Sequence, residues 1–212
     1  MNRIIELSRA AVELVNPLNK ANSTVGDILI PSKFAKQIVQ VASQISNKGL
    51  VVGNIGEISV RIPGTLEKFA INILDSSMGN LSENDLCLID ITNGRIISSK
   101  SPAKHYEWHR RFYSETTAGS VVLCQPPAAL ICGSSNICPA SSLWPDIRYI
   151  SDQLTCVAND IQEISSKSKT HQFLLIQGVG LLVTGSTLKD AFWNAEIIER
   201  FCQISIRFQE EK

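Results

Sequence analysis

The chain has 212 residues, of which 44% are hydrophobic, and 20 basic side chains balance 20 acidic ones. This length and apolar content suffice for one domain with a sizeable core. A neutral chain offers no overall attraction to a phosphate backbone, so we expect no nucleic acid partner. No apolar run approaches the roughly 20 residues that cross a bilayer, and the N-terminus lacks the hydrophobic core of a secretory signal. We therefore expect a cytoplasmic protein without a membrane partner.

The first predicted element is an amphipathic helix over residues 2–15, whose apolar side chains recur at helical spacing. A polar connector leads to Pro31, which suits the first turn of a second helix over residues 31–46. We accordingly divide the chain into an N-terminal helix with its connector, residues 1–31, and a main domain, residues 32–212.

The middle of the chain predicts short strands separated by turns, over residues 58–62, 69–74, 86–91 and 95–98. Asn93-Gly94 between the last two is a strong hairpin signal. The next predicted elements are a helix, an apolar strand and a short helix, over residues 102–115, 120–125 and 126–130.

After a loop rich in Ser and Pro, the sequence predicts an extended segment over residues 147–150 and a helix over residues 152–166. Two strands follow, over residues 173–176 and 181–183. A final helix begins at Ser186. Helices and strands interleave, but hairpins occur too. The prediction is therefore a single α/β domain with a mixed central β-sheet flanked by helices on both faces.

The chain contains six cysteines but no C-x-x-C pair. Most lie in apolar runs, so we expect buried, reduced thiols. A redox pair between Cys132 and Cys138, which bracket a short loop, is the alternative.

The most informative stretch is Gly53-Asn54-Ile55-Gly56-Glu57-Ile58-Ser59-Val60-Arg61. It resembles the glycine-rich turn and strand G-T-x-G-N-I-S-x-R of the class II aldolase/adducin family, with Glu57 in place of the asparagine. Further landmarks follow in the family's order at residues 81–90, 102–113, 121–126, 175–179 and 184–199. The resemblance covers the chain from about Phe34 to Gln209 and implies a three-layer α/β/α fold.

Family enzymes hold a catalytic zinc through three histidines, and the matching positions in this chain are Leu123, Gln125 and Gln177. Leucine cannot ligate a metal, and a neutral amide oxygen is a poor zinc donor. We therefore expect the zinc to be absent and predict no cofactor.

The family's phosphate-holding positions correspond to Glu57, Leu74, Asp75, Ala103 and Lys104. A phosphate dianion would be repelled by the two carboxylates, with only the lysine to offset them. The resemblance thus implies that sugar-phosphate binding has also been lost.

His105 stands where the family has its proton-transfer glutamate, and His109 follows four residues later. One interpretation is acid/base work by His105, since imidazole titrates near neutrality. A second is a two-histidine metal site completed by Gln125, Glu57 or Cys124. A third is purely structural: His105 fills the vacated pocket.

Two classes of function remain open. Because three metal ligands are lost together, the sequence favours a non-catalytic oligomeric scaffold or small-ligand binding protein. The alternative is a diverged carbonyl lyase or isomerase that acts on a non-phosphorylated small molecule with His105 as acid/base. The resemblance also implies self-association as a homotetramer, with the pocket between subunits.

Overall fold

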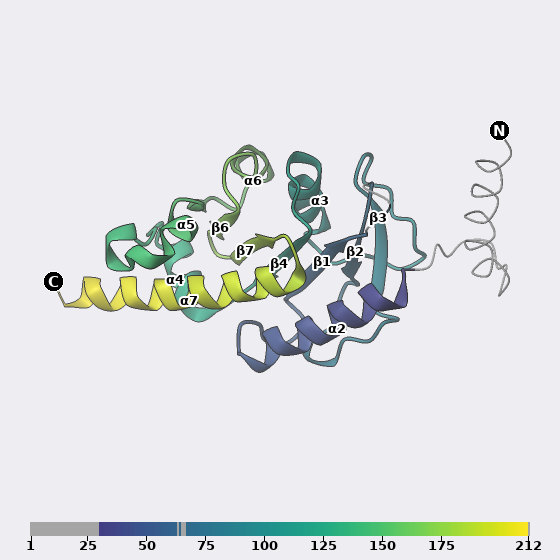
Figure 1. The fold of residues 1–212 in the computed structure, drawn as a ribbon, viewed down its shortest axis with the longest axis horizontal. Coiled ribbons are helices and arrows are strands. Elements are labelled where there is room, and N and C mark those ends of the chain that lie inside the picture. Colours follow the sequence, from purple (N-terminus) through teal and green to yellow (C-terminus); the bar gives the residue numbers. More distant parts are fainter. Residues whose placement is uncertain (1–29, 63, 65–66, 212) are drawn as a thin grey trace, which may run out of the picture.

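A computed structural model describes residues 30–62, 64 and 67–211 (Figure 1). The predicted helix over residues 2–15 and nearly all of the N-terminal unit lie outside the described residues. The main domain is built on a sheet of seven strands: β1 Glu57–Arg61, β2 Lys68–Asn72, β3 Leu86–Asp90, β4 Ser120–Cys124, β5 Leu154–Val157, β6 Phe173–Ile176 and β7 Gly180–Gly185. The described helices are α2 Ser32–Asn47, α3 Tyr106–Glu115, α4 Pro127–Ser134, α5 Arg148–Ser151, α6 Ile161–Lys167 and α7 Leu188–Glu210.

The strand order is β3-β2-β1-β4-β7-β6-β5. Every neighbouring pair is antiparallel except β5 and β6, which run parallel. This mixed sheet confirms the predicted fold class.

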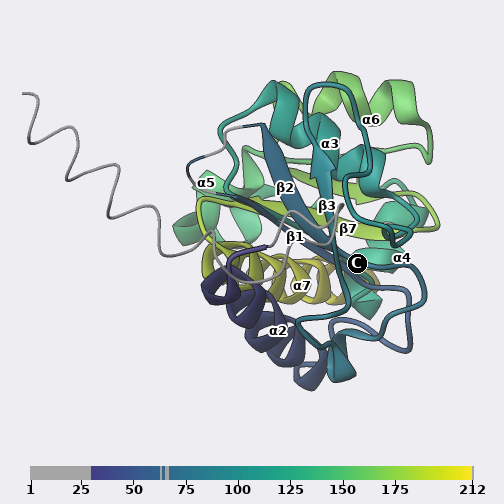
Figure 2. The ribbon, with the colours of Figure 1, turned by 90° about the vertical axis from the view of Figure 1, so that its right-hand side faces the viewer.

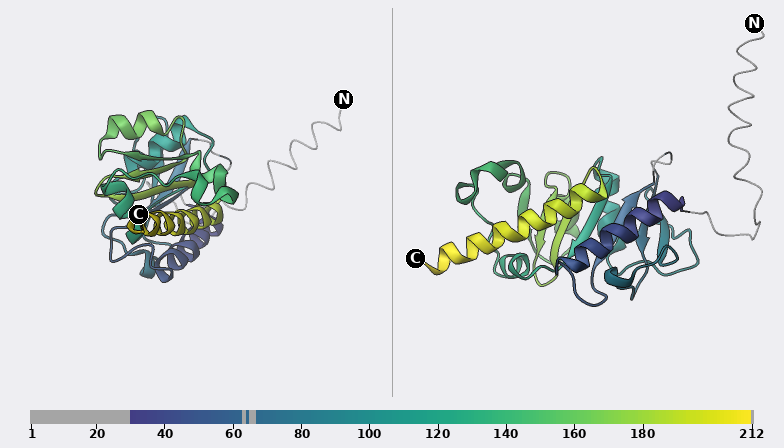
Figure 3. Two further views of the ribbon diagram at one scale, coloured as in Figure 1. Left: turned by 90° about the vertical axis from the view of Figure 1, so that its left-hand side faces the viewer. Right: turned by 60° about the horizontal axis from the view of Figure 1, so that its bottom comes forward.

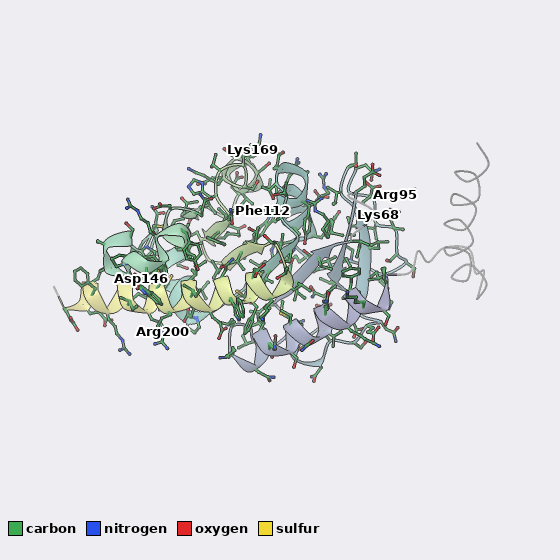
Figure 4. The ribbon with its side chains drawn as sticks, viewed as in Figure 1. Lys68, Arg95, Phe112, Asp146, Lys169 and Arg200 are labelled. Carbon is green, nitrogen blue, oxygen red and sulfur yellow. The ribbon has the colours of Figure 1, made fainter. Side chains whose placement is uncertain are left out.

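Helices cover both faces of the sheet, as Figures 1 and 2 show: α3 and α6 lie on one side, and α2 and α7 on the other. Helices α2 and α7 run next to each other across their face (Figure 3). Each face has its own hydrophobic cluster, one containing Ile38 of α2 and Ile198 of α7, the other Phe112 of α3 and Ile164 of α6. Figure 4 marks Phe112 inside the molecule and the exposed Lys169 and Arg200 at its outside.

Strand β1 separates two kinds of side chain by the period-2 rule of a pleated strand. Ile58 and Val60 belong to the cluster under α2. Ser59, between them, faces the opposite way and contacts His109 and Tyr113 of α3. The polar side of β1 is therefore buried under α3, and this side forms the candidate site.

The final helix begins later than predicted. Thr187, not Ser186, is its N-cap, and a reciprocal capping box with Asp190 fixes the start. One face of the helix joins the hydrophobic core, because Phe192, Ala195 and Ile198 are buried there.

Two predictions between residues 147 and 166 are wrong. The segment expected to be extended is the short helix α5, and the helix expected over 152–166 contains strand β5 before α6 begins at Ile161. Strand β5 forms because Leu154 to Val157 pair with Phe173 to Ile176 of β6. That partner is distant in sequence, so the local pattern could not reveal it.

The helix predicted over 102–115 begins only at Tyr106. Pro102 forms an isolated bridge with Ile73, and the Ala103 N–H donates to the Asn72 carbonyl over 2.9 Å, so this segment pairs with the end of β2 before the helix begins. Residues 95–98 similarly make only one bridge, between Ile96 and Ile89.

All six cysteines are free, and four of them are buried. The alternative of a Cys132–Cys138 disulfide is therefore not what the structure contains. No helix among residues 30–62, 64 and 67–211 is long and apolar enough to cross a membrane.

Candidate functional site

Glu57 begins strand β1 directly after the glycine turn, and only 4% of its surface is exposed. Its Oε1 lies 2.7 Å from Nδ1 of His105. The backbone N–H of His105 also donates to this carboxylate, over 3.0 Å to Oε1 and 3.3 Å to Oε2. The carboxylate is thus held by a ring nitrogen and a backbone amide of the same residue.

A second imidazole reaches the other oxygen. Nε2 of His109 lies 3.3 Å from Oε2 of Glu57, within ion-pair distance but outside hydrogen-bond geometry. The His109 side chain is wholly buried. The structure therefore brings together Glu57, His105 and His109, which the sequence grouped only as one version of a metal site.

The electrostatics of Glu57 reflect two opposing effects. Burial alone would raise its pKa, but the contacts with His105 and His109 outweigh burial and lower the pKa to about 2. Glu57 is therefore ionised at neutral pH, and its contacts with the two imidazoles stabilise the negative charge.

His105 occupies the N-cap position of α3. Its ring stacks on Trp108, with the centroids 4.1 Å apart, and 20% of its side chain is exposed. Glu57 engages Nδ1, and none of the described residues uses Nε2. An imidazole oriented at one nitrogen by a carboxylate, with its other nitrogen available, is the arrangement of a general acid or base.

Behind His109 lies a buried polar chain that sequence reasoning missed. Nδ1 of His109 is 2.8 Å from Oγ of Ser59, which in turn is 2.7 Å from the hydroxyl of Tyr113. Ser59 and Tyr113 are 0% and 2% exposed. Polar residues at inward positions of an apolar strand and helix were the available signal.

Asn72 was also missed, and it holds the glycine turn in place. Its Oδ1 accepts the Ile58 N–H over 2.8 Å, and its Nδ2 donates to the Gly56 carbonyl over 3.2 Å. A Cβ at Gly56 would lie 2.7 Å from a side-chain carbon of Val51. The glycine is therefore required for close packing, and the turn delivers Glu57 to the start of β1.

The three residues that correspond to the family's zinc ligands do not fit a metal. Leu123 is fully buried as the register partner of Glu57 on strand β4. Nε2 of Gln125 donates to the Ile55 carbonyl over 3.0 Å, and its buried Oε1 has no partner among the described residues. Gln177 is exposed.

An aliphatic side chain and two neutral amides are not a zinc donor set. In the described part of the chain, no group of three or more His, Cys, Asp or Glu side chains is placed to hold a metal ion. The two-histidine metal site considered from the sequence also loses support, because His105 and His109 both direct a ring nitrogen at the Glu57 carboxylate.

The residues that correspond to the family's phosphate-holding positions differ in how far they are exposed. Ala103 is buried, Leu74 is 46% exposed, and Lys104 is exposed. Asp75 has a φ of 61° and accepts a hydrogen bond from Asn54 over 3.2 Å. Apart from Glu57 itself, none of these residues forms a hydrogen bond or ion pair with His105 or His109 in the part of the chain that the structure describes.

A separate groove of about 820 Å³ lies between α2 and α7. Apolar side chains such as Val60, Phe192 and Trp193 line much of it. The groove is on the opposite face of the sheet from Glu57 and contains no cluster of acid/base groups among the described residues, so we place the candidate site at Glu57 and His105.

Comparison with known proteins identifies the family of the chain. The sequence model described as the Class II Aldolase and Adducin N-terminal domain matches residues 36–206. The chain belongs to the class II aldolase and adducin family. The family membership predicted from the glycine turn and the later landmarks is thereby confirmed.

Curated members of the family resemble the chain at low identity. The 3-oxo-tetronate 4-phosphate decarboxylase of Haemophilus influenzae is 24% identical over 187 residues, which cover 82% of this chain and 88% of that protein. The L-fuculose phosphate aldolase of Methanococcus vannielii is 24% identical over 177 residues, covering 80% and 94%.

Solved structures of class II aldolases share the fold. L-fuculose 1-phosphate aldolase from Glaciozyma antarctica superposes with a TM-score of 0.73 at 15% identity, covering 90% of this chain and 80% of that chain. The enzyme from Thermus thermophilus gives 0.71 at 20% identity, covering 84% and 95%. At these identities the likeness establishes the architecture alone.

Proposed function

We propose that this family member has lost the zinc and phosphate sites and exchanges a proton with a small, non-phosphorylated carbonyl compound through His105. The observation that carries the proposal is the 2.7 Å contact between Glu57 and Nδ1 of His105, which leaves Nε2 available. This contact moves the diverged-enzyme alternative ahead of the scaffold that the sequence alone favoured.

The proton transfer needs no metal to be written in balance. Nε2 of His105 takes a proton from the carbon next to the ligand's carbonyl group, and the C–H electron pair moves into an enolate. The imidazolium is stabilised by ionised Glu57 and returns a proton to the same carbon. Such general acid/base assistance contributes about 10²–10⁴-fold to a rate.

The charge at the site argues against a phosphate ester. The related proteins are named for phosphorylated compounds, a tetronate 4-phosphate and fuculose phosphate. In this chain the asparagine of the glycine turn is replaced by Glu57, whose pKa near 2 keeps it negative at neutral pH. A dianion would be repelled there, whereas a neutral or cationic carbonyl compound would not.

Proton exchange can be measured without knowing the physiological ligand. The full chain, treated with a chelator, is incubated in D₂O with dihydroxyacetone and with hydroxyacetone, and NMR follows deuterium entering the carbon next to the carbonyl. We expect exchange faster than in buffer, reduced about 10²–10⁴-fold by His105→Gln. Dihydroxyacetone phosphate should show no comparable exchange.

His171→Gln is the matched control. It changes the chain's third histidine, whose Nδ1 contacts Thr170 instead of the Glu57 cluster. Exchange that survives His105→Gln, or wild-type exchange no faster than buffer with either ketone, would overturn the acid/base role.

The second candidate is a non-catalytic scaffold or small-ligand binding protein. It is favoured by the former metal positions, where buried Leu123 and hydrogen-bonded Gln125 provide ordinary packing. We also propose that the chain assembles as a homotetramer, with a small-molecule ligand bound near the subunit contact. Sedimentation equilibrium tests this assembly, and a concentration-independent monomer would contradict it.

A further inference from the structure

The buried chain behind Glu57 is not used by the proton exchange proposed above. It runs from His109 of α3 through Ser59 of β1 to Tyr113 of α3, with contacts of 2.8 and 2.7 Å. All three side chains are 2% exposed or less. Buried polar groups of this kind must satisfy one another, so the positions of their protons can be deduced.

The carboxylate of Glu57 decides which nitrogen of His109 carries the proton. A neutral imidazole carries one N–H, and the nitrogen of His109 that faces Oε2 of Glu57 is Nε2, at 3.3 Å. A bare Nε2 lone pair would be repelled by the anion, so the proton belongs on Nε2. Nδ1 is then an acceptor. The hydroxyl of Ser59 donates to it over 2.8 Å, a shorter contact than the 3.4 Å from the same hydroxyl to the Val121 carbonyl.

The contact between Ser59 and Tyr113 also has a defined donor. With its proton directed to His109, Oγ of Ser59 has lone pairs that can accept from the Tyr113 hydroxyl. Burial raises the pKa of Tyr113, so this hydroxyl stays protonated. The order of donation is therefore Tyr113 to Ser59, Ser59 to His109, and His109 toward Glu57.

We propose that Ser59 and Tyr113 are positioning residues that hold His109 as its Nε2–H tautomer and thereby reserve Glu57 for His105. The inference rests on the proposed role of the Glu57–His105 pair. With His109 fixed in this tautomer, Glu57 stabilises the imidazolium that forms when the partly exposed His105 takes up a proton.

This series of hydrogen-bonded side chains orients His109 and does not carry protons to the surface. Tyr113 is packed against Phe69, at a centroid distance of 4.9 Å, and under the guanidinium of Arg61. Arg61 also donates to the carbonyls of Tyr113 and Thr116, over 2.6 and 3.1 Å. These bonds tie the end of α3 to β1 and keep the Tyr113 hydroxyl on Ser59.

Histidine NMR of the full chain tests the proposal directly, because only three histidines are present. Nitrogen-15 shifts of the side chains report which ring nitrogen carries the proton. We expect a single Nε2–H tautomer for His109 in the wild-type protein near neutral pH. Ser59→Ala leaves the buried Nδ1 of His109 without a donor, which opposes the preference that Glu57 gives to the Nε2–H form, so a second protonation state of His109 should appear beside it. Tyr113→Phe, which keeps the ring packing, should have the same effect to a smaller extent.

Ser120→Ala is the matched control. Ser120 is equally buried on the adjacent strand β4, but its hydroxyl donates to the Thr187 carbonyl over 2.7 Å, next to α7. This substitution should leave the His109 signal unchanged. Thermal unfolding followed by circular dichroism verifies that each variant is folded.

A His109 that keeps the pure Nε2–H tautomer in folded Ser59→Ala or Tyr113→Phe would overturn the inference. So would a wild-type protein with the proton on Nδ1. Neither result depends on turnover. Absent ketone exchange together with the expected tautomer pattern would instead refute the proposed function and leave the positioning of His109 intact.

Discussion

Glu57 accepts two hydrogen bonds from one residue, His105: from Nδ1 at 2.7 Å and from the backbone N–H at 3.0 Å. The backbone donor stands at the N-cap of α3, where the helix dipole favours a negative charge. A single carboxylate therefore fixes both the start of the helix and the orientation of the imidazole.

This arrangement predicts a specific acid sensitivity. The pKa of Glu57 falls from 4.5 to about 2 on folding, so between these values the unfolded chain binds a proton that the folded chain does not. Stability is then present above about pH 4.5 and declines as the pH falls toward 2. The expected loss is on the order of 3 kcal/mol.

Denaturant unfolding at a series of pH values measures this loss. Glu57→Gln should flatten the decline, whereas Glu83→Gln, at an exposed site hydrogen-bonded to Ser32, should not. An undiminished decline in Glu57→Gln would show that other carboxylates cause it.

Chelation is expected to have no effect on stability. A ligand that binds only the folded state raises the unfolding temperature by mass action, and Leu123, Gln125 and Gln177 provide no donor set for zinc. Calorimetry of the chain before and after dialysis against a chelator should give the same midpoint, and added zinc should not raise it. One tightly bound zinc per chain in elemental analysis would contradict this prediction.

Glu199 predicts a local cap effect. Its carboxylate accepts the N–H groups of Ala128 and Ala129 over 3.1 and 2.9 Å at the start of α4, where the N-cap residue Pro126 supplies no side-chain acceptor. Glu199→Ala leaves both donors buried and should cost about 1–3 kcal/mol of unfolding free energy. Glu196→Ala, on the same helix, removes only a surface ion pair with Lys48 and should cost about 0–1 kcal/mol. Equal losses would contradict the capping role.

The turn between β6 and β7 predicts a contrast between two glycines. Gly178 and Gly180 have φ values of 68° and 139°, but only at Gly180 would a Cβ strike the backbone, 2.3 Å from the Cys124 carbonyl oxygen. Gly178→Ala should therefore cost about 1–2 kcal/mol from conformation alone. Gly180→Ala should cost clearly more, because strand β4 would have to move. Urea midpoints compare the two, and a milder effect at Gly180 would be inconsistent with this packing.

The glycines and the periodicity of the apolar residues allowed most of the fold to be predicted. The turn before Glu57, strand β1 and helix α7 follow from local patterns, and their beginnings were predicted within a few residues. Strand β5 was missed because its four residues form a strand only by pairing with β6. The residues in and around β5 do not indicate which strand will pair with it.

The site was predictable by position but not by contact. Glu57 was identified from its place in the turn and was interpreted as an anion facing the ligand. The structure adds that the carboxylate is buried against His105 and His109, about fifty residues later. Ser59 and Tyr113 were overlooked because their importance depends on the same packing of α3 on β1.

The register of β1 against β4 places residue 123 directly beside residue 57 on the α3 side of the sheet. Directly opposed side chains on neighbouring strands have Cβ atoms about 4.5–5.5 Å apart. An imidazole at position 123 would therefore compete with His105 for the carboxylate, whereas the hydrocarbon of Leu123 cannot. The register that brings Leu123 beside Glu57 therefore leaves the carboxylate to the imidazole of His105.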